Sequence, residues 1–312
     1  MNEHIYAGAM NTMRDKLLKF SAALSILTPT YVAGASVIHF DEAVRFAPNV
    51  ASTDYSEVRL TLSPDGRTAL WFSRDRPGGP GSYDIWVSRR LANAWAKATP
   101  VSFNSPTRDF DPAFSSDGAF VYFCSDRPGG YGADDIYRVA VTAEGFGAIE
   151  NLGSAVNSAG NEFAPMLSPD GTQLLFSSDR SGGMGAHDLY IASRQHEGFD
   201  IARPVDGTLN TEANEFDATF LADGTTIVFA RAKDFRTDRV DLFVAAKFEA
   251  RYDAGERLPL SVNDVVTDTY GPMLDWSDSS RLSFSGQRTP AGGMDLYLVK
   301  YSLKSEKDEP KN

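Results

Sequence analysis

Cysteine and histidine are scarce in this sequence. Its 312 residues include one cysteine, Cys124, and four histidines. A single thiol excludes an intrachain disulfide and a zinc cluster of cysteines. Cys124 stands inside an apolar run, which predicts a buried structural thiol rather than a nucleophile. We therefore expect no disulfide, no metal site and no cofactor.

Positive charge is also in short supply. The 30 lysines and arginines are outnumbered by 42 aspartates and glutamates, so the formal net charge is -12 at pH 7. Nucleic acids and anionic membrane surfaces select basic patches, and this composition argues against both as partners. A neutral or basic partner is easier to accommodate.

Common catalytic signatures are missing as well. The sequence contains neither a G-x-S-x-G nor an H-E-x-x-H motif, so two frequent hydrolase arrangements find no support. Only His187 and His196 follow residue 39, and nothing in the sequence pairs either with a nucleophile. We expect a protein that is not an enzyme.

The N-terminus has the pattern of an export signal. A basic region precedes a mostly apolar stretch at residues 20–32, and residues 33–35 supply the small-x-small pattern of a cleavage site. Removal of residues 1–35 would leave a periplasmic or secreted protein that begins at Ser36. The apolar stretch is too short and too interrupted for a membrane span, so we expect no membrane insertion. An amphipathic N-terminal helix is the alternative.

A strand-loop-strand repeat organises the rest of the chain. Each copy is an apolar-aromatic run, a mostly glycine-rich polar stretch, and an aspartate followed by Ile or Leu and then an aromatic residue; copies begin at residues 71, 120, 174, 227 and 282. A further strand precedes each copy, joined to it in four cases by Asp-Gly, which suits a tight hairpin. The aspartates of these turns, Asp65, Asp117, Asp170 and Asp223, are 52 or 53 residues apart. This period is the length of one propeller blade.

The start of the chain is expected to complete the last blade. Segments that end at Asn104, Asn157, Asn210 and Asn263 supply four fourth strands for five blades. Residues 39–52 resemble these segments, so a strand from this stretch would close the ring and leave no open sheet edge. We predict an all-β fold: a single monomeric β-propeller of five four-stranded blades over residues 36–303, with a disordered tail at 304–312. A diverged sixth blade is the alternative.

The SPDG turns, the SDRPGG loops and the DIY or DLY third strands resemble the TolB-type propeller repeats (WD40-like, or PD40) of bacterial envelope proteins. The resemblance covers about residues 40 to 300. It implies a periplasmic β-propeller with a protein-binding role. The chain differs from TolB in having five recognisable repeats and no separate N-terminal domain, and it has no added hydrolase or peptidoglycan-binding domain in its repeat region.

Candidate site residues repeat on one face of the predicted disc. This face carries the longer, glycine-rich loops and the connections into each new blade, so it is the better candidate for recognition. Four acids stand at the starts of the innermost strands: Glu57, Asp109, Glu162 and Glu215. The loops add Arg76, Arg127, Arg180, Tyr83 and Tyr131. Arginine and aromatic residues are the types that usually anchor interfaces.

The four carboxylates have two interpretations. A closed ring places them around one mouth of the central channel, where they could hold a cation or the basic end of a ligand. Alternatively, each pairs with a nearby arginine or loop amide and fixes blade to blade. From the whole site set we expect a binding surface for an envelope protein or peptide. The alternative is a carbohydrate-binding or glycoside-hydrolysing propeller, in which two of Asp109, Glu162 and Glu215 act as acid and base.

One more acid recurs in every blade, at the start of the third strand. The five residues are Asp84, Asp135, Asp188, Asp241 and Asp295. A feature required once per blade is most simply structural, and we expect each carboxylate to accept hydrogen bonds from loop N–H groups. We expect turn geometry to explain the paired glycines of the same loops.

Overall fold

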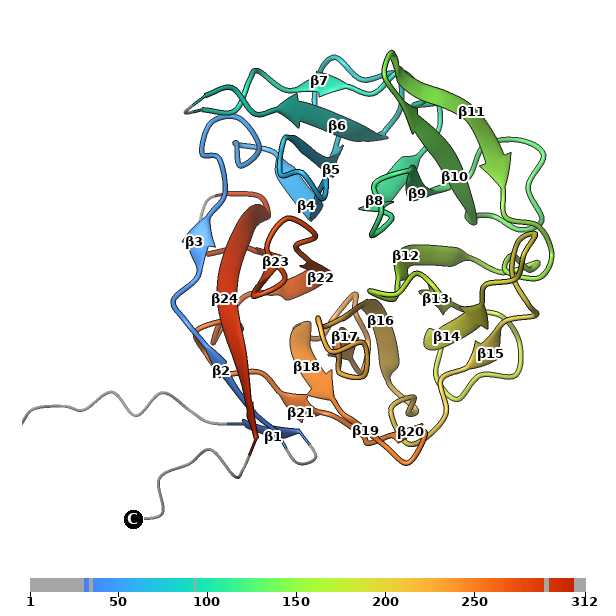
Figure 1. Ribbon diagram of the computed structural model, residues 1–312, viewed down its shortest axis with the longest axis vertical. Helices are drawn as coiled ribbons and strands as arrows, with labels where there is room; N and C mark the ends of the chain where they lie inside the picture. The colour runs from blue at the N-terminus through green and yellow to red at the C-terminus, as the bar shows by residue number, and fades with distance from the viewer. Residues whose placement is uncertain (1–30, 34–35, 93, 289–291, 306–312) are drawn as a thin grey trace, which may run out of the picture.

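The computed structural model describes residues 31–33, 36–92, 94–288 and 292–305. Within these ranges the regular elements are all β-strands, and they form a ring of five four-stranded antiparallel blades (Figure 1). The prediction of an all-β, five-bladed propeller is confirmed, and no sixth blade occurs in the described part of the chain. No helix there is long and apolar enough to cross a membrane.

Each blade is a meander that starts at the central channel and runs outward. The innermost strands are β4 (Ser56–Leu62), β8 (Asp109–Phe114), β12 (Glu162–Leu167), β16 (Asn214–Phe220) and β22 (Thr269–Leu274). The second strands are β5 (Thr68–Arg74), β9 (Phe120–Ser125), β13 (Gln173–Ser178), β17 (Ile227–Ala232) and β23 (Arg281–Gly286). The third strands are β6 (Tyr83–Arg89), β10 (Asp135–Thr142), β14 (Asp188–Ser193), β18 (Asp241–Ala245) and β24 (Asp295–Ser305).

The fourth strands are short in all blades except the second. They are β7 (Thr99–Pro100), β11 (Gly145–Asn151), β15 (Arg203–Pro204), β21 (Glu256–Arg257) and β3 (Val44–Arg45). A small hairpin of β19 (Lys247–Phe248) and β20 (Arg251–Tyr252) precedes β21.

Strand β3 closes the ring as predicted, because it pairs with β24 of the last blade. In the register, Arg45 faces Tyr297 and Val44 faces Leu298. Strand β2 (Ser36–Phe40) also pairs with β24, and β1 (Tyr31–Ala33) pairs with β2, as the left side of Figure 1 shows. This partner lets β24 continue to Ser305, beyond the expected end of the ordered chain at residue 303.

The expected export signal lies mostly outside the described residues. Residues 1–30 and 34–35 are not among them, and Tyr31–Ala33 form β1. Cleavage after residue 35 would remove β1 and retain β2. The export signal and the tail at residues 306–312 stay predictions.

Neighbouring blades bury the central strands on both faces, so these strands are apolar along their length rather than alternating. In β9, five of six residues are buried, and Cys124 has no exposed surface. Burial raises the pKa of the Cys124 thiol well above its usual value, which keeps it protonated and unreactive. The prediction of a buried structural thiol is confirmed.

Candidate functional site

The four predicted carboxylates are buried and ion-paired inside their own blades. Their side chains have no exposed surface, and the pairs are Arg76–Glu57 at 3.5 Å, Arg127–Asp109, Arg180–Glu162 at 3.1 Å and Arg231–Glu215 at 2.6 Å. A backbone N–H four residues earlier also donates to each carboxylate, as Ser158 does to Glu162 at 2.7 Å. The geometry therefore matches the internal-pairing interpretation. It leaves these acids no exposed surface for direct contact with a ligand.

The predicted arginines are held by aromatic rings as well as by the carboxylates. The Arg180 guanidinium lies 5.3 Å from the ring centroid of Phe176 and 4.6 Å from that of Tyr190, and it donates to the backbone carbonyl of Val156. The same stacking on aromatic rings holds Arg76, Arg127, Arg231 and Arg288. The side chains of Arg76, Arg127 and Arg180 are only 14–16% exposed, so they contribute little surface to a partner.

Two further arginines, Arg231 and Arg288, stack on aromatic rings in the same way, but the sequence pattern did not indicate them. Arg231 stands opposite Glu215 on β17, where the first three blades carry serine, and Arg288 lies in a Gly-Gln-Arg sequence rather than Ser-Asp-Arg. Glu215 itself was the available signal for Arg231, because a buried carboxylate needs a compensating partner. In the fifth blade Thr269 replaces the acid, and Arg288 donates to the Val262 carbonyl at 2.7 Å.

The third-strand aspartates fix the long loops in three blades. Asp135 accepts hydrogen bonds from the N–H groups of Tyr131 at 2.7 Å and Gly132 at 3.0 Å. Asp84 and Asp188 hold their loops in the same way. The expected structural role is confirmed in these blades. The second glycine of the pair is also explained, since a Cβ on Gly130 would lie 2.5 Å from a carboxylate oxygen of Asp135.

The last two blades use the equivalent aspartate differently. Asp241 pairs with Arg239 and Arg257 at 2.9 and 2.8 Å, and Asp295 pairs with Arg45 at 2.7 Å. Their loops lack the glycine pattern at the same spacing. At Asp241 arginine side chains take the place of the loop N–H groups, so the expectation of loop N–H donors is corrected for this residue. For Asp295 the expectation concerns a loop that lies partly outside the described residues.

Of the two predicted tyrosines, Tyr83 lines the cavity at the channel mouth and Tyr131 does not. Tyr131 is 53% exposed on the loop between β9 and β10. Tyr83 stacks on Phe72 with ring centroids 5.7 Å apart and meets Phe110 edge-on at 5.9 Å. Tyr83 thereby joins the wall of the cavity at the channel mouth.

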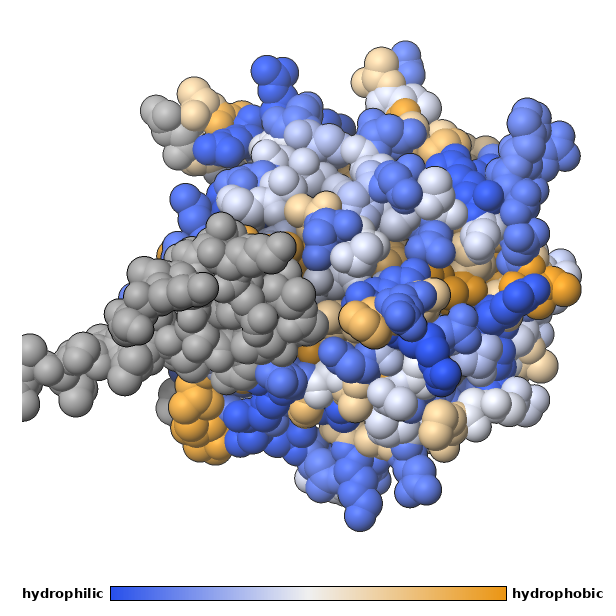
Figure 2. All heavy atoms as spheres, turned by 60° about the horizontal axis from the view of Figure 1, so that its bottom comes forward, coloured by the Kyte–Doolittle hydropathy of each residue, from blue (hydrophilic) through white to orange (hydrophobic). Residues whose placement is uncertain are grey.

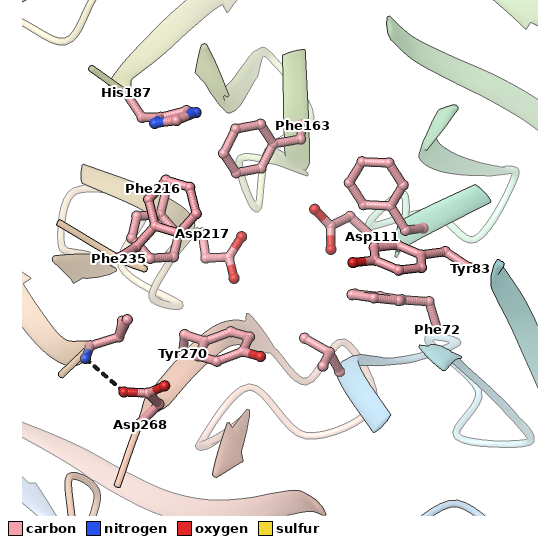
Figure 3. Close-up of a pocket in the computed structure, with 13 residues that line it drawn as sticks. Phe72, Tyr83, Asp111, Phe163, His187, Phe216, Asp217, Phe235, Asp268 and Tyr270 are labelled. Atoms are coloured by element: carbon pink, nitrogen blue, oxygen red, sulfur yellow. Dashed lines mark hydrogen bonds between the residues drawn. The ribbon is translucent and has the colours of Figure 1, made fainter. Parts of the chain in front are cut away.

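This cavity has a volume of about 310 Å³ and lies on the face that the sequence indicated for recognition (Figure 3). Every blade contributes the residue that follows its first-strand acid or Thr269: Val58, Phe110, Phe163, Phe216 and Tyr270. Loop and strand-end residues add Phe72, Tyr83, His187, Phe235, Val240 and Asp268. The walls are therefore mainly aromatic. The sequence indicated this face but not the residues that line the cavity.

A β-bulge in each innermost strand shapes the channel beneath the wall. The pairing register shifts in all five strands, and the residue at the shift has positive φ: Arg59, Asp111, Ala164, Asp217 and Gly271, with φ between 47° and 65°. Bulges re-aim side chains, and such backbone strain often accompanies functional sites. Here the bulges bring Asp111 and Asp217 into the cavity lining.

The base of the cavity is a carboxylate pair that shares one guanidinium. Arg59 has no exposed surface; its Nε lies 3.8 Å from Asp111 Oδ1 and its Nη1 lies 3.7 Å from Asp217 Oδ1. Figure 3 shows the two carboxylates pointing toward the centre of the cavity. Burial raises the pKa of both aspartates, and the neighbouring charge of Asp217 further raises the pKa of Asp111. A single cation does not fully compensate two buried acids.

His187 is part of the aromatic wall. Its ring centroid lies 5.4 Å from that of Phe163 and 5.3 Å from that of Phe235, with edge-to-face geometry. Its Nδ1 is 3.0 Å from Asn214 Oδ1. These contacts fix the ring as a packing and hydrogen-bonding element.

Comparison with known proteins supports the fold and does not show a family. No family model matches the sequence, and no curated protein matches it. A putative TolB from Agrobacterium tumefaciens has a TM-score of 0.50 at 16% identity, with 81% of each chain covered.

Two other solved structures reach the same TM-score. A protein of unknown function from Dyadobacter fermentans is 10% identical, with 86% of this chain and 99% of that chain covered. A thermostable family-43 glycoside hydrolase is also 10% identical, with 85% and 97% covered. At these identities the three likenesses show that the chain shares the propeller fold, and they assign it no activity.

Proposed function

We propose that this protein is a non-enzymatic binding protein of the bacterial cell envelope, and that it holds a segment of a partner protein in the cavity at the channel mouth. The observation that carries the proposal is the aromatic wall, to which all five blades contribute. Aromatic side chains supply large contact area at binding sites, and concave, mostly apolar pockets with a few polar groups are typical ligand sites.

The geometry favours binding over catalysis. Asp111 and Asp217 share the guanidinium of Arg59, and His187 packs between two phenylalanines. The envelope location rests on the export pattern of residues 1–35 and on the sequence resemblance to TolB-type repeats.

Selection from a random peptide display library would test this function. Phe163→Ala and Phe235→Ala each remove one partly exposed ring from the cavity, so they are expected to weaken binding of selected peptides at least tenfold. Ile201→Ala is the matched control, because Ile201 is 76% exposed on the connection between β14 and β15, away from the cavity. Peptides that bind the cavity variants as well as the unaltered protein would contradict the proposal.

The carboxylate pair favours a second candidate, a glycan ligand or substrate. Glycoside hydrolysis uses two carboxylates on either side of the bond that breaks, and one of them has a raised pKa. Asp111 and Asp217 both line the cavity, and burial raises the pKa of both, whereas Asp109, Glu162 and Glu215 have no exposed surface. Release of reducing sugar from a glycan panel, abolished by Asp217→Asn, would favour this candidate over peptide binding.

A further inference from the structure

Acidic side chains outnumber basic ones in the cavity. Asp111, Asp217 and Asp268 line it, and Arg59 is the cation at its base. Asp268 accepts a hydrogen bond from the Val240 N–H at 3.0 Å, which orients the carboxylate without neutralising it.

The arginines near the rim do not cancel this charge. Arg108 lies 5.9 Å from the Phe110 ring centroid, but it is paired with both Asp126 and Asp134 at 2.9 and 2.8 Å. Arg236 is exposed beside Phe235, 5.7 Å from its ring centroid. The cavity therefore keeps an excess of carboxylate.

The aromatic wall adds to the attraction for a cation. The face of an aromatic ring carries partial negative charge, so Lys and Arg side chains bind favourably within about 6 Å of a ring centroid. Arg127, Arg180 and Arg231 already show this arrangement elsewhere in the protein. The volume of about 310 Å³ is at the lower end of ligand pockets, which suits one long side chain.

An exposed apolar surface lies beside the cavity, between the fourth and fifth blades. Phe235, Val265 and Val266 are 41%, 62% and 77% exposed. Arg239 donates to the Val265 carbonyl at 2.5 Å and so joins the two loops that carry these residues. We call these three residues the apolar shoulder. In Figure 2, apolar groups on the face shown are small and separated by polar residues.

We propose that the cavity binds a lysine or arginine side chain of a partner protein segment, while an adjacent apolar residue of that segment packs on the shoulder. This inference rests on the proposed function and specifies its ligand. The cation would lie over the Asp111–Asp217 pair with aromatic rings around its aliphatic stem. The net charge of -12 favours the approach of a basic segment.

The test uses two peptide probes that differ by one charge. Acetyl-Val-Lys-Val-amide is titrated into the full chain and followed by protein NMR, beside the same peptide with norleucine in place of lysine. We expect the lysine peptide to bind at least tenfold more tightly. Asp217→Asn should abolish this preference, whereas Asp200→Asn, which removes an exposed carboxylate between β14 and β15, should preserve it.

Equal affinity for the two peptides, no binding of either, or an unchanged preference in Asp217→Asn would overturn the inference. The proposed function fails separately, when library peptides bind Phe163→Ala as well as they bind the unaltered protein. Selected peptides that depend on Phe163 but contain no basic residue would leave the proposed function standing and refute its cationic ligand.

A separate variant tests the contact with the apolar shoulder. Val266→Ser should weaken binding of acetyl-Val-Lys-Val-amide severalfold and leave binding of acetyl-Gly-Lys-Gly-amide unchanged. Equal losses of affinity for both peptides would refute the shoulder contact.

Discussion

At the scale of single residues, one backbone position carries four different residue types across the five blades. The bulge position holds Arg59, Asp111, Ala164, Asp217 and Gly271. Gly271 makes room for the buried arginine, because a Cβ there would lie 3.0 Å from Arg59 Cγ. The backbone conformation at this position is thus the same in every blade, while its side chains form an asymmetric cluster of one arginine and two aspartates.

Glu57 is expected to make stability depend on pH. Burial raises its pKa from 4.5 to about 7, against the opposing effects of Thr53 and Arg76. The folded protein therefore binds this proton more tightly than the unfolded chain, so the contribution is fully present below about pH 4.5 and is lost as the pH rises through about 7. The unfolding free energy of the unaltered protein should fall between pH 5 and pH 8. In Glu57→Gln this fall should be smaller by roughly 1–3 kcal/mol, because glutamine does not titrate.

Urea denaturation at both pH values measures this difference. Glu197→Gln, at an exposed position, is the control and should leave the pH dependence unchanged. An equal pH dependence in the unaltered protein and Glu57→Gln would show that Glu57 does not titrate in this range.

At the scale of the elements, an asparagine side chain substitutes for missing strand. The fourth strands of the first, third and fourth blades pair over only two residues, and there Asn104, Asn210 and Asn263 hydrogen-bond both the N–H and the C=O of one third-strand residue. Asn157 makes the same contacts in the second blade, where β11 is long. In the last blade Ser52 makes the equivalent contacts to Leu296. This equivalence explains why residues 39–52 could be matched to the repeat from the sequence.

Loss of one asparagine clamp should destabilise the propeller. Asn210 contacts the Leu189 N–H and C=O at 2.9 and 3.0 Å, and it is 5% exposed. Asn210→Ala leaves both backbone groups unpaired, so we expect the unfolding free energy to fall by about 2–4 kcal/mol. Chemical denaturation measures the loss, with the exposed Gln195→Ala as control. A change below about 0.5 kcal/mol would show that water replaces the amide without cost.

At the scale of the whole molecule, the sequence predicted the ring better than the site. Apolar strands, Asp-Gly turns and a period of 52 or 53 residues carry the fold, because each blade repeats them. The cavity depends on what differs between blades. Side chains of a regular innermost strand point toward neighbouring blades, and only the bulges bring Asp111 and Asp217 into the cavity. Strand periodicity alone does not reveal such a shift.

Ring closure should control global stability. A chain that begins at Ser52 lacks β2 and β3 and loses the buried side chains of Ile38, Phe40 and Phe46. At about 1.5–3 kcal/mol for each buried side chain, the loss approaches the total stability of an ordinary domain. We expect Cys124 to react with a thiol reagent much faster in this truncated chain than in one that begins at Ser36.

Addition of a peptide of residues 36–52 should restore protection of Cys124 in the truncated chain, because it supplies the missing strands. Equal labelling rates of Cys124 in the chains that begin at Ser36 and Ser52 would show that the ring stays folded when the fifth blade lacks its fourth strand.

The pairing of β3 with β24 also has a consequence for biogenesis. The ribosome makes residues 44–45 near the beginning and their partners, residues 297–298, only after four blades have been synthesised. The ring therefore cannot be sealed during translation until the chain has passed this point. A nascent chain that stalls earlier keeps unpaired strands at both ends, which marks it for chaperones and proteases rather than for function.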